Sequence, residues 1–217
     1  TMGDSQDFGD MPDTNTSTPG TCSSRTRGLF GGGYPYTNRI CFFTFSSTGD
    51  SSDFGDLSQS RSNLNGLGDG IRGVFVGGYT GSNQTTMDYV TISQTGNAVD
   101  FGDLTGATNS GLIANSSTRG LIGGISNGTN TIDFITIATT GNAQDFGDLA
   151  IITVSQTGAA SSPTRGVIMG GIGGSPRTGQ NVSQKIEILS TGNTVDFGDI
   201  TTARSAGGGI SNAHGGL

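Results

Sequence analysis

Paired aspartates recur along this chain, and paired carboxylates can bind a hard cation or carry out acid–base chemistry. Each pair flanks a Phe-Gly dipeptide, which gives the tetrad Asp-Phe-Gly-Asp at intervals of 45 to 51 residues. Carboxylate oxygens suit Ca²⁺, so a calcium site is one hypothesis. The aspartates are equally suited to capping turn amides and pairing with arginine, and we favour that structural role and assign no metal. The tetrads begin at Asp7, Asp53, Asp100, Asp145 and Asp196.

Arginine-glycine dipeptides follow the first four tetrads after 16 or 17 residues. An arginine in every repeat, matched by aspartates, predicts a ring of structural ion pairs. A ring of arginines that lines a central channel and binds anions is the alternative. The predicted ion pairs join Arg27, Arg72, Arg119 and Arg165 to Asp53, Asp56, Asp100, Asp103, Asp145, Asp148, Asp196 and Asp199.

No residue pattern predicts catalysis or a cofactor. A glycosidase needs two carboxylates at unlike sites, whereas repetition produces like sites. Glu187, the only glutamate, occupies a strand position that holds threonine in other repeats. His214, the only histidine, has no nucleophile motif near it. The glycine pairs lack the helix-opening context of a phosphate-binding loop. We therefore expect a protein that is not an enzyme.

Tyrosines mark the loops that follow the glycine pairs in the first two repeats. Exposed tyrosines can stack on sugars, although ordinary loop packing is the alternative. These loops also hold most of the length variation between repeats, and variable loops on a rigid scaffold are where binding usually resides. The candidate ligand-facing residues are Tyr34, Tyr36, Tyr79, Asn83, Asn127 and Arg177.

Four short strands must position these residues in each repeat. A strand of small residues follows the tetrad, and the second strand begins at Arg-Gly and ends in glycines. The third alternates apolar and polar residues, as at Ile135, Thr136 and Ile137. Period-two alternation indicates one buried face. A Gly four residues before each tetrad, such as Gly141, then predicts a tight turn into a fourth strand.

A four-stranded unit repeated radially is a propeller blade. We predict a single all-β domain over residues 1–217, a β-propeller of about five blades, with a linear β-solenoid as the alternative. The four whole repeats are residues 11–57, 58–104, 105–149 and 150–200. Residues 201–217 and 1–10 supply two half-repeats, and either the fifth blade is incomplete or a neighbouring subunit completes it. The second option predicts a homo-oligomer, because an open strand edge recruits another strand.

Composition restricts the partners. With 40 Gly, 31% hydrophobic and 12% charged residues, the chain has the composition of an all-β protein. A net charge of -7 argues against nucleic-acid binding. No apolar run is long enough to cross a membrane. Cys22 and Cys41 are the only cysteines, and the sequence leaves open whether they pair.

The glycine-closed second strand and the aromatic residue of the fourth resemble a kelch motif, with Phe in place of the usual Trp. The phrases Thr-Arg-Gly-Leu-Ile-Gly-Gly at 118–124 and Ser-Asn-Ala-His-Gly-Gly-Leu at 211–217 are similar to kelch-like repeats in structural proteins of tailed bacteriophages, including cyanophages. The resemblance implies a tail- or fibre-associated virion component that contacts itself, other virion proteins and a host-surface glycan. An extracellular lectin-like or filament-forming microbial protein is the alternative.

Overall fold

The computed structural model describes residues 4–11, 17–109, 111–124, 129–152, 158–173, 178–204 and 209. Within these ranges the chain forms 17 strands in four antiparallel sheets, and none of these residues is helical. The described residues accordingly include no helix long and apolar enough to span a bilayer. The prediction of an all-β protein is confirmed.

The four kinds of strand expected from the repeats are present in the expected order. The short first strands are β1 (Gly20–Ser23), β5 (Asn65–Gly68), β9 (Leu112–Asn115) and β13 (Gly158–Ser161). The Arg-Gly strands are β2 (Arg27–Gly31), β6 (Arg72–Val76), β10 (Arg119–Gly123) and β14 (Arg165–Met169). The alternating strands are β3 (Thr37–Thr44), β7 (Gln84–Thr91), β11 (Thr131–Thr136) and β16 (Thr178–Glu187). The tetrad strands are β4 (Ser52–Arg61), β8 (Val99–Thr108), β12 (Gln144–Asp148) and β17 (Val195–Arg204), and a short β15 (Ile172–Gly173) pairs with β16.

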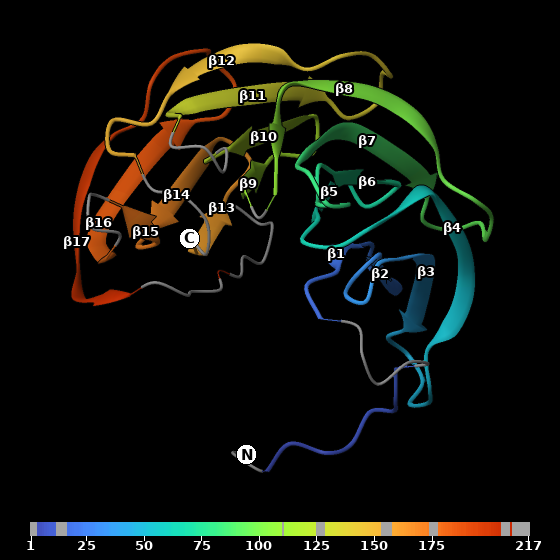
Figure 1. Ribbon diagram of the computed structural model, residues 1–217. Helices are drawn as coiled ribbons and strands as arrows, with labels where there is room; N and C mark the ends of the chain where they lie inside the picture. The colour runs from blue at the N-terminus through green and yellow to red at the C-terminus, as the bar shows by residue number, and fades with distance from the viewer. Residues whose placement is uncertain are drawn as a thin grey trace.

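The sheets, numbered 1 to 4 along the chain, follow one another round an open arc (Figure 1). The first strands lie innermost, where β1 contacts β5, β5 contacts β9 and β9 contacts β13. The tetrad strands lie on the outer rim, where β4 contacts β8 and β8 contacts β12. An opening separates sheet 4 from sheet 1, and residues 4–11 project from sheet 1 along it. We call residues 4–11 the N-terminal arm.

The hydrophobic core lies between successive sheets. One cluster joins Leu57 of sheet 1 to Phe75 of sheet 2. A second joins Phe101 of sheet 2 to Ile137 of sheet 3, and a third joins Phe146 of sheet 3 to Ile188 of sheet 4. Each sheet therefore completes the apolar face of the sheet before it, which a single repeat could not bury by itself.

The two cysteines belong to this core or its edge. Cys22 and Cys41 are both buried, and no disulfide joins them. Burial raises the pKa of the Cys22 thiol to about 12. The thiol of Cys22 therefore stays protonated and unreactive at neutral pH, as expected of a small core residue.

Candidate functional site

The three loop tyrosines predicted to face a ligand form one aromatic cluster. Tyr34 and Tyr36 precede β3 in sheet 1, whereas Tyr79 precedes β7 in sheet 2. The ring centroid of Tyr36 lies 5.8 Å from that of Tyr34 and 6.2 Å from that of Tyr79. Tyr34 and Tyr36 are 59% and 44% exposed. The neighbouring sheets thus present a shared aromatic surface that is open to solvent.

Backbone pairing holds these loops in place. Tyr34 exchanges two backbone hydrogen bonds with Ser17, its own N–H donating to the Ser17 carbonyl at 2.9 Å. Tyr79 does the same with Ser62, and its N–H donates at 2.7 Å. Because the backbone of two cluster members is fixed, a flat ligand that stacks on the rings has to order their side-chain torsions but not the backbone of these two residues.

The loop that carries Tyr79 also carries the amide residue Asn83. Asn83 forms an isolated backbone bridge with Tyr79, and its side-chain oxygen accepts a hydrogen bond from Asn109 Nδ2 at 2.8 Å. Aromatic rings and an amide residue on one loop can offer both stacking and hydrogen bonds, the combination that a sugar ring requires. The other two candidate residues, Asn127 and Arg177, lie outside the described residues.

The tetrads join each sheet to the next. Between sheets 2 and 3, the Gly141 N–H donates to the Phe101 carbonyl at 2.7 Å and the Ala143 N–H donates to the Asp103 carbonyl at 2.8 Å. In return, the Asp103 N–H donates to Asn142 Oδ1 at 3.0 Å. We call these three contacts the tetrad–turn joint.

Among the described residues, the tetrad–turn joint occurs four times. The arm's tetrad, which begins at Asp7, occupies the turn at Gly49 of sheet 1, where the Asp10 N–H donates to Asp50 Oδ1 at 2.9 Å. The tetrads of sheets 1 and 3 occupy the turns at Gly96 and Gly192 in the same way. The sequence analysis identified turns and tetrads but did not predict that they bind one another.

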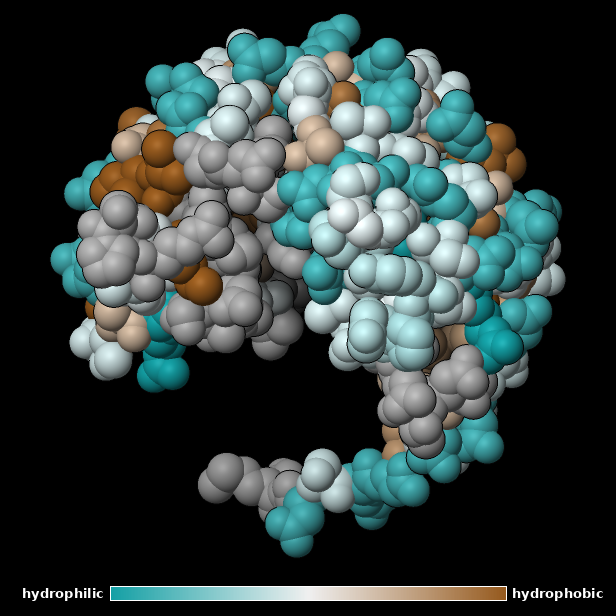
Figure 2. Space-filling view, viewed as in Figure 1, coloured by the Kyte–Doolittle hydropathy of each residue, from teal (hydrophilic) through white to brown (hydrophobic). Residues whose placement is uncertain are grey.

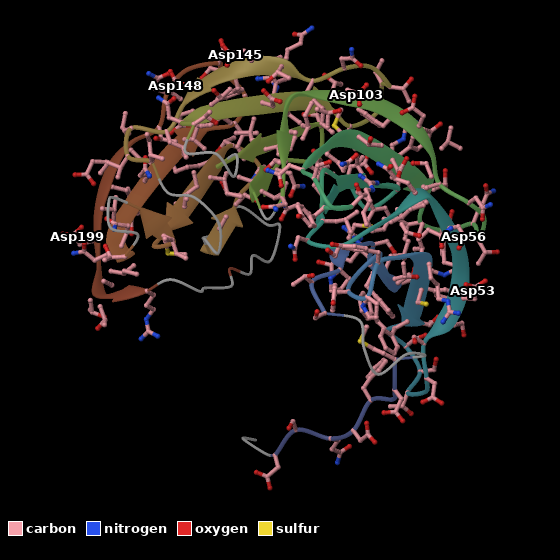
Figure 3. All side chains as sticks on the ribbon, in the orientation of Figure 1. Asp53, Asp56, Asp103, Asp145, Asp148 and Asp199 are labelled. Carbon is pink, nitrogen blue, oxygen red and sulfur yellow. The ribbon has the colours of Figure 1, made fainter. Side chains whose placement is uncertain are left out.

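The tetrad carboxylates themselves lie on the outer rim, as the labelled aspartates of Figure 3 show. Several accept hydrogen bonds from nearby backbone amides, as Asp100 Oδ1 does from the Gly102 N–H at 3.2 Å. Among the described residues, no three Asp, Glu, His or Cys side chains converge as metal ligands. The local hydrogen bonds match the turn-capping role that we favoured for these aspartates.

The predicted ion pairs between repeat arginines and tetrad aspartates are wrong. Arg72 lies 4.3 Å above the ring of Tyr89 and donates to the Ile137 carbonyl of the next sheet at 2.9 Å. Arg27 and Arg119 make the same two kinds of contact, and exposed Arg165 pairs with Glu187 at 3.2 Å. No described tetrad aspartate pairs with any of the four arginines. The aspartates lie on the rim, whereas Arg27, Arg72 and Arg119 each lie over an aromatic ring deeper in the sheet.

The inner strands line a shallow central depression of about 860 Å³. Its lining is largely Ser, Thr and Gly, and includes Ser23, Ser116 and Ser162. Arg25 lines this depression, whereas none of the four Arg-Gly arginines does. The alternative of an arginine-lined anion channel therefore has no support in the described part of the chain.

Sequence analysis missed a buried ion pair between sheets 1 and 2. Arg61 and Asp88 are both fully buried, and Arg61 Nη2 donates to Asp88 Oδ2. Arg61 Nη1 also donates to the carbonyls of Gly77 at 2.5 Å and Thr86 at 2.8 Å. Burial lowers the pKa of the Arg61 guanidinium, and the Asp88 charge opposes that effect. β4 continues to Arg61, four residues past the predicted repeat boundary at 57. The Arg61 side chain therefore reaches Asp88 in sheet 2.

A second buried carboxylate occupies the position equivalent to Asp88 in sheet 3. Asp133 accepts hydrogen bonds from the Thr105 N–H at 2.8 Å and the Thr105 hydroxyl at 2.5 Å. Burial raises its pKa despite these donors. In sheet 4, Gln184 occupies this position and accepts from the Ile151 N–H at 3.0 Å. For Asp88 and Asp133, a charged residue between apolar neighbours in the third strand was the available signal, whereas Gln184 lies between Ser183 and Lys185 and carries no such signal.

The chain matches no protein-family model, and no curated protein is significantly similar to it.

Proposed function

We propose that the four sheets are blades of a kelch-like β-propeller of about five blades. Three features support this arrangement over a linear solenoid. Each sheet has the strand order of a blade, successive sheets bury a shared core, and the inner strands of neighbouring sheets contact one another. The opening in Figures 1 and 2 is the place of the remaining blade.

We propose that the protein is a non-enzymatic structural and adhesion component of a phage virion, associated with a tail or fibre. The observation that supports this most directly is the repeated tetrad–turn joint, which makes the molecule an extended interlocking scaffold. The resemblance of its repeats to phage structural proteins is the reason for proposing a phage virion as the particle. Its partners would be further copies of itself and other virion proteins.

The test of the virion proposal is particle composition. In the phage whose genome encodes this chain, CsCl-purified particles should contain it at many copies, and gold-labelled antibody should mark a tail or fibre in micrographs. A chain found only in the soluble fraction of the lysed host, and absent from purified particles, would show that the proposal is wrong.

Glycan binding at the tyrosine cluster is the second candidate function, and it suits a lectin-like protein as well as a phage adhesin. The open three-ring surface formed by Tyr34, Tyr36 and Tyr79 favours it. Tyr36 is central, because its ring contacts both others. Such a site would bind a sugar by stacking, and Asn83, on the loop that carries Tyr79, would offer a hydrogen-bonding group.

Tyr36→Ala should weaken glycan binding about tenfold, because losing one stacking ring removes roughly 1–2 kcal/mol. Surface polysaccharide from the host, immobilised on a sensor, is the probe. Phe45→Ala is the matched control, since Phe45 is an exposed aromatic residue (51%) at another site. Equal binding by the native chain and both variants would rule out the tyrosine cluster.

A further inference from the structure

One tetrad and one turn are left over from the tetrad–turn joints. The sequence holds five tetrads and a turn glycine four residues before each, at Gly3, Gly49, Gly96, Gly141 and Gly192. Four of the tetrads occupy the last four turns. Within the described residues, the tetrad of β17, which begins at Asp196, occupies no turn. The turn that the sequence pattern assigns to Gly3 lies at the edge of the described residues.

The β17 tetrad has the shape of an unoccupied joint. Phe197 is 54% exposed, whereas the equivalent Phe101 and Phe146 are 2% and 3% exposed. A Cβ added at Gly198 would meet nothing within 4 Å, whereas one added at Gly102 would lie 2.5 Å from the Gly141 carbonyl oxygen. Gly198 nevertheless has a backbone conformation similar to that of Gly102, with φ at +119° compared with +132° at Gly102. The acceptor half of the joint is therefore already formed.

Arg165 indicates independently that sheet 4 lacks its following neighbour. Arg72 and Arg119 each donate to a carbonyl of the next sheet. The side chain of Arg165, at the equivalent position, is half exposed, and among the described residues its hydrogen-bond partner is Glu187 of its own sheet. The edge of sheet 4 thus leaves two different inter-sheet contacts unmade.

The N-terminal arm provides the complementary half. Asp4 follows Gly3 as Asp50 follows Gly49, and Asp50 is the residue that accepts from a tetrad N–H in the first joint. Asp4 and Ser5 are both exposed. In Figure 1 the arm leaves sheet 1 and does not reach β17, because the opening of the arc lies between them.

We propose that β17 binds the segment Asp4–Ser5 of a second copy of this chain through a fifth tetrad–turn joint. In that contact, the Ser5 N–H donates to the Asp199 carbonyl, and the Asp199 N–H donates to Asp4 Oδ1. Because β17 belongs to sheet 4 and the arm is bound to sheet 1, the two halves lie on different surfaces of each copy. The contact is therefore head-to-tail and propagates into a ring or a filament. The inference rests on the proposed assembly function and names its partner.

Self-association of the purified 217-residue chain, measured by sedimentation velocity over a range of concentrations, tests this joint. Asp4→Ala should weaken association about fivefold, which is what one hydrogen bond supplies. Asp4→Asn should retain association, because asparagine occupies this position in three of the internal joints. Gly198→Ala should abolish association, because its Cβ would occupy the space that the incoming turn requires.

Asn142→Ala is the matched control, since it removes the same acceptor from an internal joint. Asn142→Ala should lower the melting temperature and leave the association constant unchanged. Asp4→Ala should lower the association constant and leave the melting temperature of the monomer unchanged. A native chain that stays monomeric at every concentration would overturn the proposal. So would a melting temperature of the monomer that falls on Asp4→Ala, because the arm would then close its own ring. Since only the purified chain is used, either failure leaves the particle test of the virion proposal unaffected.

Discussion

Arg61→Met should lower the free energy of unfolding by about 3–5 kcal/mol, the usual result of removing one partner of a buried ion pair. The substitution leaves the Asp88 carboxylate buried without its counter-charge, and the carbonyls of Gly77 and Thr86 lose a shared donor. Methionine nearly matches the length of the arginine stem, so the loss reflects charge and hydrogen bonding more than volume. Urea denaturation at pH 7, with a shared m-value, measures the difference.

Two further variants separate the charge effect from general damage. The double variant Arg61→Met with Asp88→Leu should recover most of the lost stability, because a well-packed apolar pair can replace a buried ion pair at little cost. Arg165→Met is the matched control. Its partner Glu187 is exposed, so the change should stay within about 1 kcal/mol. Arg61→Met and Arg165→Met losing equal stability would mean that the buried pair contributes nothing beyond a surface pair.

Gly102→Ala should lower the free energy of unfolding by roughly 3 kcal/mol or more, because it combines overpacking with backbone strain. Its Cβ would lie 2.5 Å from the carbonyl oxygen of Gly141, which belongs to the turn of the next sheet. The φ of +132° also disfavours any residue with a Cβ. Sheets 2 and 3 would have to separate at the rim for alanine to fit.

Gly198→Ala measures the free-energy cost of backbone strain alone. Gly198 and Gly102 share a backbone conformation, but only Gly102 has a neighbouring turn packed against it. With φ at +119° and nothing within 4 Å, alanine at 198 should cost only about 1–2 kcal/mol of strain in the monomer. Thermal unfolding at a concentration too low for association should therefore rank native, Gly198→Ala and Gly102→Ala in order of falling stability. If the two variants melt together, the tetrad–turn joint contributes nothing to holding the sheets.

The tyrosine cluster shows how far residue types and spacing led toward a site. Tyr34, Tyr36 and Tyr79 stood out because they follow glycine pairs on variable loops. Their spacing, with Tyr79 more than forty residues beyond Tyr36, could not show that the rings meet. That contact depends on two sheets lying side by side at the same height. Sequence analysis therefore identified candidate residues, and only the packing of sheets 1 and 2 assembled them.

By itself, the sequence determined the all-β class, the four kinds of strand and their order within each sheet. These follow from local signals: two-residue alternation, glycine turns and a period near 46 residues, all of which act over a few neighbouring residues. Tertiary structure alone decided the partners of the charged groups. Arg72 contacts a carbonyl 65 residues away, and Arg61 contacts an aspartate 27 residues away. An arginine can satisfy its donors with a carboxylate, a carbonyl or an aromatic face, and only the position of the next sheet determines which of these lies within reach.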